Sequence, residues 1–199
     1  MRVIVFDTET TGLPNGSDDL DTQPYICQFA AIIYEYSAGE WEEAETIDII
    51  IRPEIPIPLM ATALHGISDE DVADKETFGA YVHQIIEAFQ TSDVAVAHNI
   101  SFDQKMMEIE LLRLGRSKQF LPEQTFDTML ESREVCQIPG KNGNFRSPKL
   151  MALHEFLFNE KFERAHNALN DVRATARCLQ ELASREVFSP IEPSQGALF

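Results

Sequence analysis

The chain carries near its start the stretch Phe6-Asp7-Thr8-Glu9-Thr10-Thr11-Gly12-Leu13, which follows an apolar run at residues 3–6. A run of this kind is typical of a buried strand. Side chains two residues apart on a strand share a face, so we expect Asp7 and Glu9 side by side where the apolar run ends. Two carboxylates that close repel unless their pKa values rise or a cation binds. Oxygen ligands of this kind suit Mg²⁺ or Mn²⁺, although an isolated pair is more simply a solvated acidic turn.

The composition is that of a soluble globular protein. The 199 residues suffice for one domain with a buried core, and 44% of them are hydrophobic and 25% charged. No apolar run is long enough to cross a bilayer and no signal peptide is recognisable, so we expect a cytoplasmic protein without a membrane partner. Cys27, Cys136 and Cys178 lack metal-ligand spacing, and we expect them to be reduced and packed.

The charge is strongly negative and unevenly distributed. The formal net charge is −17, from 16 basic and 33 acidic residues, and only three of the basic residues precede residue 101. Such a protein is a poor non-specific binder of nucleic acid. Any contact surface for nucleic acid is therefore expected in the second half, where Lys141, Arg146 and Lys149 lie in a stretch rich in Gly, Asn and Pro. Ordinary surface charge is the alternative interpretation.

The apolar pattern predicts an α/β fold. Expected strands lie at residues 3–6, 26–36, 41–52, 94–97 and 125–128, and expected helices at residues 81–89, 102–114, 150–158 and 168–184. A further short helix is expected after Ser68, which could form a capping box with Asp71. A turn at Ala38-Gly39 makes the second and third strands a hairpin, so the sheet is mixed, with an antiparallel hairpin joined to parallel strands. Residues 186–199 show little apolar periodicity, which predicts a flexible tail after a domain of residues 1–185.

Two further acids and a histidine bear on the first pair. Asp103 lies in the first turn of the helix expected after the strand at residues 94–97, and Asp171 lies in the first turn of the last helix, with His166 on the loop before it. Ends of adjacent strands converge in such folds, and sites form there. Taken singly, each acid is more simply an N-terminal charge that suits the helix dipole, and a lone histidine is more often structural.

Together these segments resemble a known family. F-D-T-E-T-T-G-L, A-H-N-I-S-F-D and H-N-A-L-N-D, at residues 6–13, 97–103 and 166–171, are similar to the three signature motifs of the DEDD 3′→5′ exonucleases. The spacing of His166 and Asp171 resembles the DEDDh branch, which includes RNase T and the epsilon proofreading subunits of bacterial DNA polymerase III. The resemblance extends from Arg2 to about Leu182 and implies an RNase H-like fold, a five-stranded mixed sheet flanked by helices.

The resemblance also implies an activity. The expected enzyme hydrolyses single-stranded DNA from its 3′ end to nucleoside 5′-monophosphates, in proofreading or repair, with two Mg²⁺ or Mn²⁺ ions. The residues that it assigns to the metals are Asp7, Glu9, Asp103 and Asp171. His166 is the implied general base, because its pKa lies near working pH. RNA is the alternative substrate. A non-catalytic adaptor for a polymerase or clamp is the alternative function, and the complete set of acids argues against it.

Substrate contacts are also carried over from the family. The backbone around Thr8, Thr10 and Thr11 is expected to meet the terminal nucleotide. Leu13 and Phe102 are expected to stack on terminal bases, with core packing as the alternative. His65 and Asn99 are expected to line the same cleft. Gln28 departs from the pattern, since many relatives carry Glu there, and we expect it to be a substrate contact.

The end of the chain resembles a short recognition peptide. Gln195-Gly196-Ala197-Leu198-Phe199 is similar to the Q-x-x-L-F peptide that binds bacterial sliding clamps. The predicted clamp contacts are Gln195, Leu198 and Phe199, because two apolar anchors on an extended peptide suit a groove. A chance match in a disordered end is the alternative. A polymerase subunit is the other protein partner that the resemblance implies.

Overall fold

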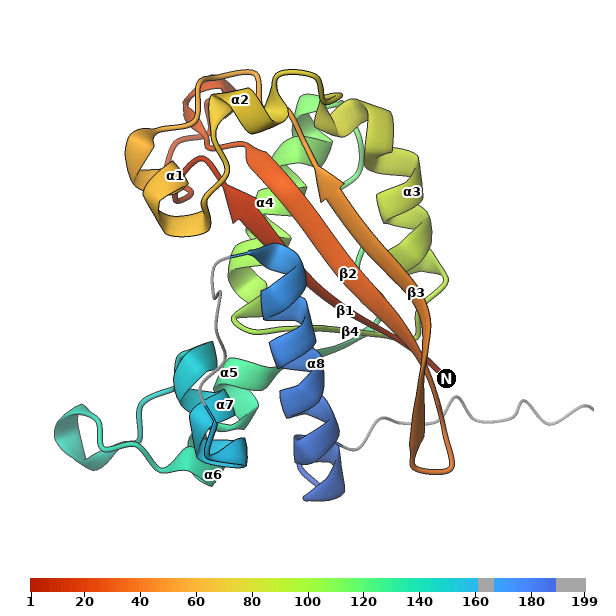
Figure 1. Cartoon of the computed structure of the whole chain (residues 1–199), viewed down its shortest axis with the longest axis vertical. Helices are drawn as coiled ribbons and strands as arrows, with labels where there is room; N and C mark the ends of the chain where they lie inside the picture. Colours follow the sequence, from red (N-terminus) through yellow and green to blue (C-terminus); the bar gives the residue numbers. More distant parts are fainter. Residues whose placement is uncertain (161–166, 189–199) are drawn as a thin grey trace, which may run out of the picture.

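The computed structural model describes residues 1–160 and 167–188. Its centre is a five-stranded sheet in the order β3-β2-β1-β4-β5 (Figure 1). The strands are β1 (Arg2–Thr10), β2 (Ile26–Ser37), β3 (Glu40–Ile50), β4 (Val94–Ala97) and β5 (Gln124–Asp127). β1, β2 and β3 pair antiparallel, whereas β4 is parallel to both β1 and β5. The expected mixed sheet, an antiparallel hairpin joined to parallel strands, is confirmed.

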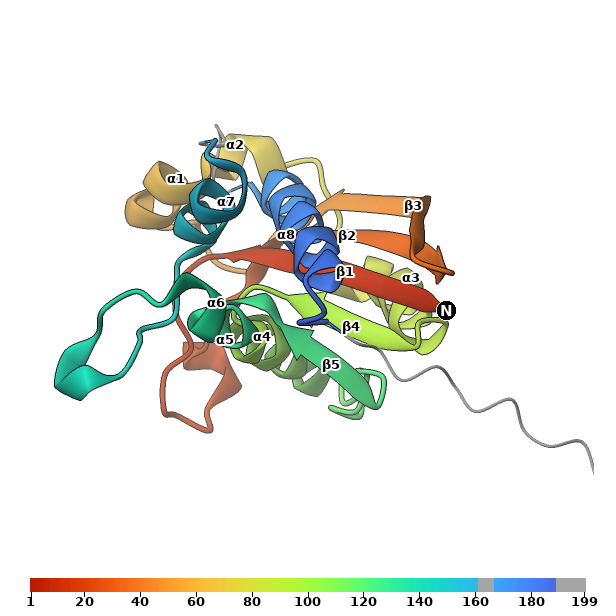
Figure 2. The same cartoon turned by 90° about the horizontal axis from the view of Figure 1, so that it is seen from below.

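Helices cover both faces of this sheet. They are α1 (Leu59–His65), α2 (Asp69–Val72), α3 (Phe78–Gln90), α4 (Ile100–Arg113), α5 (Thr128–Glu131), α6 (Arg133–Cys136), α7 (Leu150–Phe158) and α8 (Ala168–Ser184), with short 3₁₀ turns at Leu20–Thr22 and Lys141–Gly143. α8 lies on one face, and α3 and α4 lie on the other (Figure 2). The predicted capping box of α2 is present, since Ser68 and Asp71 bond reciprocally. α1 was not expected, because three prolines precede it.

β1 is longer than the apolar run that predicts it. It continues through both acids to Thr10, with Asp7 opposite Ala30 and Glu9 opposite Gln28 of β2. Val3 and Val5 pack in the cluster under α8, whereas the even-numbered Ile4 and Phe6 pack under α3 and α4. Alternation along the strand therefore puts both acids on one face, as expected, and this is the face that α8 covers.

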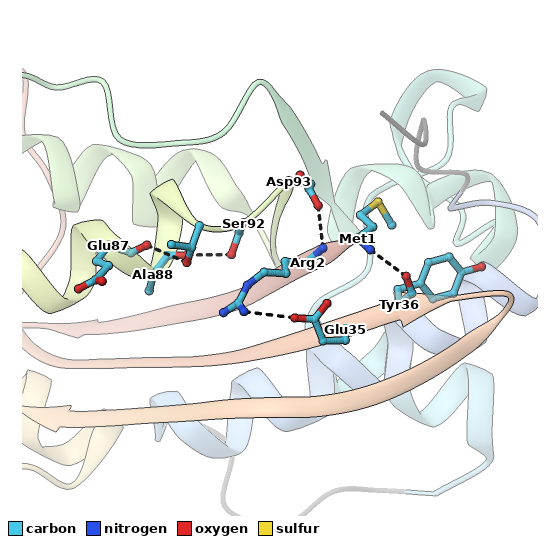
Figure 3. Close-up of polar contacts among 9 residues, drawn as sticks. Met1, Arg2, Glu35, Tyr36, Glu87, Ala88, Ser92 and Asp93 are labelled. Carbon is cyan, nitrogen blue, oxygen red and sulfur yellow. Dashed lines mark hydrogen bonds and ion pairs between the residues drawn. The ribbon is translucent and has the colours of Figure 1, made fainter. Parts of the chain in front are cut away.

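The start of β1 is fixed by paired polar groups (Figure 3). The amino group of Met1 donates to the carbonyl of Tyr36 at 3.1 Å, and the backbone N–H of Arg2 donates to Asp93 Oδ2 at 2.8 Å. The guanidinium of Arg2 lies 3.2 Å from Glu35 Oε1. These contacts tie β1 to its neighbours β2 and β4 at the edge of the sheet where the chain begins.

The domain extends past the boundary expected at residue 185. Phe188 is only 5% exposed and packs against the rings of Trp41 and Phe126, with centroids 6.0 and 4.9 Å away. A tail beginning at residue 186 is therefore wrong for Phe188, because an isolated aromatic residue gave no periodic signal. The three cysteines are free and buried, as predicted. Among the described helices, none combines the length and the apolar character that crossing a membrane requires.

Candidate active site

Four carboxylates from three elements meet near the end of β1. Asp7 and Glu9 lie on β1, whereas Asp103 and Asp171 lie in the first turns of α4 and α8. One carboxylate oxygen each of Asp7, Glu9 and Asp171 lie within 4.8 Å of one another. Glu9 and Asp103 are buried, at 8% and 2% exposure. The four acids that the sequence singled out thus share one region, although about 160 residues separate the first from the last.

Asp103 approaches from the opposite face of the sheet. Thr8, between the two acids of β1, points toward α4, where its N–H and hydroxyl both donate to Asp103 Oδ1, at 2.9 and 2.7 Å. These two bonds fix one oxygen of Asp103 against the strand that carries Asp7 and Glu9. Thr8, predicted as a substrate contact, therefore also positions an acid.

The acids influence each other's protonation. Burial raises the pKa of Glu9 to about 8, and the charges of Asp171 and Asp103 add to the rise. Burial, followed by the charges of Asp103, Glu9 and Asp171, also raises the pKa of Asp7 well above its usual range. The pKa of Asp103 rises to about 7 through burial, although the bonds from Thr8 oppose the rise. Like charges in a poorly solvated place favour proton uptake or cation binding.

Asp127 at the end of β5 sets where α4 begins. Its Oδ1 accepts from the N–H of Asn99 at 3.0 Å, and its Oδ2 accepts from the N–H of Ile100 at 3.2 Å. Asn99 adopts the left-handed conformation, with φ 75°, as the chain turns into α4. Because Asp103 lies one turn further, Asp127 positions it indirectly. No role for Asp127 was predicted, since the bond joins residues 28 positions apart.

A groove of about 380 Å³ lies beside the acids. Six residues predicted to contact substrate line it: Thr8, Thr10, Thr11, Leu13, His65 and Phe102. Asn99 was also predicted to contact substrate, but it does not line the groove. It lies instead in the turn that leads into α4. The groove also includes residues that were not predicted, namely Pro58, Met60, Ala61 and Leu64 of α1 and the segment before it.

The rim of the groove is apolar and open. Leu13 is 80% exposed and Met60 87% exposed, so core packing is excluded for Leu13. Phe102 is half-buried, and it both packs against the core and lines the groove. His65 is buried, with its Nδ1 accepting from the N–H of Ile67 at 3.1 Å. The other ring nitrogen of His65 lies 3.7 Å from Cys27 Sγ.

Gln28 was expected to touch substrate, and the structure contradicts this. It is 1% exposed. Its Nε2 donates to Asp48 Oδ1 of β3 at 2.7 Å, while its Oε1 accepts from the N–H of Ala168 at 3.1 Å and from Asn167 Nδ2 at 3.3 Å. Asn167 is in turn the N-cap of α8. Gln28 therefore docks the N-terminus of α8, and with it Asp171, onto the strand beside Glu9.

Four predicted residues lie outside the described part of the chain. They are His166 and the clamp contacts Gln195, Leu198 and Phe199, and their roles stay predictions. The carboxylate set itself fits a hard divalent cation, because it offers only oxygen ligands, and burial together with mutual repulsion raises the pKa values of Asp7 and Glu9.

Comparison with known proteins identifies the family of the chain. The RNase T exonuclease family model matches residues 4–179. A DNA polymerase III subunit epsilon-like protein of Rhodobacter capsulatus is 34% identical over 184 residues, which are 92% of this chain but only 24% of that protein. The chain thus spans about a quarter of that relative's length.

Solved structures share the fold. The structure of exonuclease X in complex with 5′ overhanging duplex DNA matches with a TM-score of 0.59 and 25% identity over 94% of each chain. The nuclease domain of 3′hExo, described as a DEDDh family member bound to rAMP, matches with a TM-score of 0.74 and 15% identity over 96% of each chain. These likenesses confirm the expected RNase H-like fold. With the family model covering nearly all of the described chain, the protein belongs to the RNase T family of exonucleases.

Proposed function

We propose that this exonuclease removes nucleoside 5′-monophosphates from the 3′ end of single-stranded DNA, with two Mg²⁺ or Mn²⁺ ions held by Asp7, Glu9, Asp103 and Asp171. The observation that carries the proposal is the gathering of these carboxylates, three of which bring oxygens within 4.8 Å of one another. Bound divalent cations would stabilise the negative charge that develops during phosphodiester hydrolysis and make water a better nucleophile.

The residues of the chain have separate tasks in this proposal. Asp7, half-buried and influenced by the charges of the other three acids, is assigned to both ions. Asp103 Oδ1 accepts two hydrogen bonds from Thr8, so we assign the other carboxylate oxygen, Oδ2, to a cation. His166 precedes the N-cap of α8 in the sequence, and we assign it the proton of the attacking water. The chain's part in catalysis is then to hold charge, orient the scissile phosphate and accept one proton.

The groove supports a nucleotide as the ligand. Its exposed apolar side chains, Leu13, Met60 and Leu64, offer surfaces on which any base can stack, so little sequence preference is expected. The relative from Rhodobacter is named for a polymerase subunit, and the exonuclease X structure contains duplex DNA with an overhang. Both names agree with DNA as the substrate.

The test is a digestion of 5′-labelled single-stranded DNA with Mn²⁺, analysed on a sequencing gel. The expected result is a ladder that shortens from the 3′ end and 5′-monophosphates as products. An unchanged ladder with the Asp7→Ala variant would overturn the proposed site. RNA of equal sequence, digested in parallel, decides the sugar preference: faster cleavage of RNA would replace the DNA assignment.

A further inference from the structure

A folded hairpin connects α6 to α7, and we name residues 138–149 the basic hairpin. Pro139 and Phe145 form a β-bridge, and the N–H of Gly140 donates to the carbonyl of Asn144 at 2.9 Å. A Cβ at Gly140 would lie only 2.7 Å from that carbonyl oxygen, so the close approach requires glycine. The basic hairpin therefore has a defined shape, and it projects from the body of the molecule (Figure 2).

The basic hairpin carries a net positive charge in a protein whose net charge is strongly negative. It carries Lys141, Arg146 and Lys149, and no acid lies between Glu134 and Glu155. All three basic side chains are exposed. Within residues 1–160 and 167–188 none of the three takes part in an ion pair, whereas other basic residues of the same half do, including Arg113, Arg177 and Arg185. Their charge is thus available to a ligand.

The base of the basic hairpin is anchored to the end of β4, beside the turn into α4. His98, at the end of β4 and directly before Asn99, has its Nε2 3.2 Å from the carbonyl of Pro148. Burial lowers the pKa of His98 to about 4, so the ring is neutral and Nε2 must carry its proton to donate to that carbonyl. In Figure 2 the basic hairpin and α1, which borders the groove, both lie toward the end of the molecule opposite the N-terminus, whereas Figure 1 shows α1 beside the end of β1 and the basic hairpin further away, beyond α5 and α7.

We propose that the basic hairpin binds the phosphate backbone of a single-stranded polynucleotide upstream of the nucleotide in the groove. This inference rests on the proposed function and adds a second contact to it. A net charge of −17 repels a polyanion, so a long substrate is held best where cations are exposed and fixed in place. Contacts to phosphate carry no sequence information, which suits an enzyme that removes any terminal nucleotide.

The test compares two substrates of different length. One is 5′-labelled single-stranded DNA of about 20 nucleotides, which is long enough to reach beyond the groove. The other is the p-nitrophenyl ester of thymidine 5′-monophosphate, which occupies only the terminal-nucleotide site. The variant is Lys141→Ala/Arg146→Ala/Lys149→Ala, and the matched control is Lys118→Ala, which removes an exposed lysine from the loop before β5.

The expected result is a length-dependent loss. The triple variant should lose roughly tenfold in kcat/KM on the long DNA at low salt, several times more than on the ester, and the slope of log kcat/KM against log salt should flatten by about 2. The control should follow the wild type on both substrates. Equal losses on the two substrates, or no loss on the long DNA, would overturn the role of the basic hairpin. Failure of the wild-type protein to cleave either substrate would instead overturn the proposed function.

Discussion

The two ends of β1 differ in how their charged groups are paired. At its start, Arg2 lies 3.2 Å from Glu35, and the N–H of Arg2 is held by Asp93 (Figure 3). At its end, burial raises the pKa of Glu9 to about 8, and the charges that add to the rise are those of the acids Asp171 and Asp103. The first end is neutralised from within the fold, whereas the second accumulates like charge at a cost in stability. Such a cost is expected where the missing charge comes from bound cations.

The largest expected effect comes from Asp7→Asn. This variant keeps the shape of the side chain but removes the charge assigned to both ions, so kcat/KM on single-stranded DNA should fall by about 10³-fold or more. Asp93→Asn at the other end of the sheet is the matched control and should stay within about twofold of the wild type, because among the described residues the Asp93 carboxylate accepts only from the backbone N–H of Arg2. Comparable losses of kcat/KM in Asp7→Asn and Asp93→Asn would show that catalysis does not depend specifically on the carboxylates at the end of β1.

The apolar rim should matter next. Met60→Ala combined with Leu13→Ala removes two exposed apolar surfaces against which bases can pack, and full burial of one such side chain contributes about 1.5–3 kcal/mol. We expect KM for single-stranded DNA to rise by roughly tenfold and kcat to change little. Leu130→Ala, on α5 and 48% exposed, is the control for loss of an exposed apolar side chain. A fall in kcat with unchanged KM would contradict stacking as the role of the rim.

Gln28 offers an exchange that tests its positioning role. Gln28→Glu replaces the donor to Asp48 by a second carboxylate, so α8 should shift and kcat/KM should fall by about five- to tenfold. The double variant Gln28→Glu/Asp48→Asn restores the hydrogen bond with donor and acceptor exchanged, and most of the activity should return. Mn²⁺ concentration for half-maximal rate is measured alongside, because it reports where Asp171 lies. Absence of rescue would show that Gln28 acts in some other way.

Repulsion among the carboxylates at the end of β1 should make the stability of the metal-free protein depend on pH. A carboxyl group with a raised pKa in the folded state binds its proton more tightly than in the unfolded chain. The free energy of unfolding of the metal-free protein should therefore fall as pH rises from about 4.5 to about 8, the range between the ordinary and the raised pKa of Glu9.

Asp171→Asn relieves part of this repulsion. In EDTA it should raise the melting temperature by roughly 2–4 °C at pH 8, which corresponds to about 1 kcal/mol, and change it little at pH 5. Differential scanning calorimetry at the two pH values provides the measurement. A lower melting temperature at pH 8 would mean that Asp171 stabilises the metal-free fold, contrary to our interpretation of its charge.

A substitution at the start of β1, where Arg2 pairs with Glu35, should change stability and activity least. Arg2→Ala breaks a partly exposed ion pair, and such pairs contribute about 0–1 kcal/mol. Urea unfolding should show a loss of that size or less, and activity on DNA should match the wild type. A large loss of activity would mean that the two ends of β1 are coupled.

The sequence predicted the elements with strong local patterns. α7 and α8 occupy the predicted residues, because both show apolar spacing and a clear start and stop. The acids were found because their spacing on β1 and in the first turns of two helices resembles a known set. α1 was missed, since three prolines precede it and its exposed Leu59 and Met60 give no inward-facing stripe.

Long-range contacts were beyond prediction. Gln28 and Ala168 are hydrogen-bonded although 140 positions separate them, and Asp127 and Asn99 although 28 positions separate them. No local sequence pattern predicts either bond. Similarly, Leu13 was given two interpretations, and only the fold shows that it is exposed at the groove. Residues that orient the acids are thus harder to find than the acids, because their partners are chosen by tertiary structure.

The most direct test of the carboxylate cluster is calorimetric titration of Mn²⁺ into metal-free protein at pH 8 and pH 6, with thymidine 5′-monophosphate present. We expect two ions per chain at pH 8, affinity that weakens as pH falls through the raised pKa values of Asp103 and Glu9, about 7 and about 8, and loss of at least one ion in Asp7→Asn. Binding that is absent at pH 8, or that is unaffected by Asp7→Asn, would show that the four carboxylates are not the metal site.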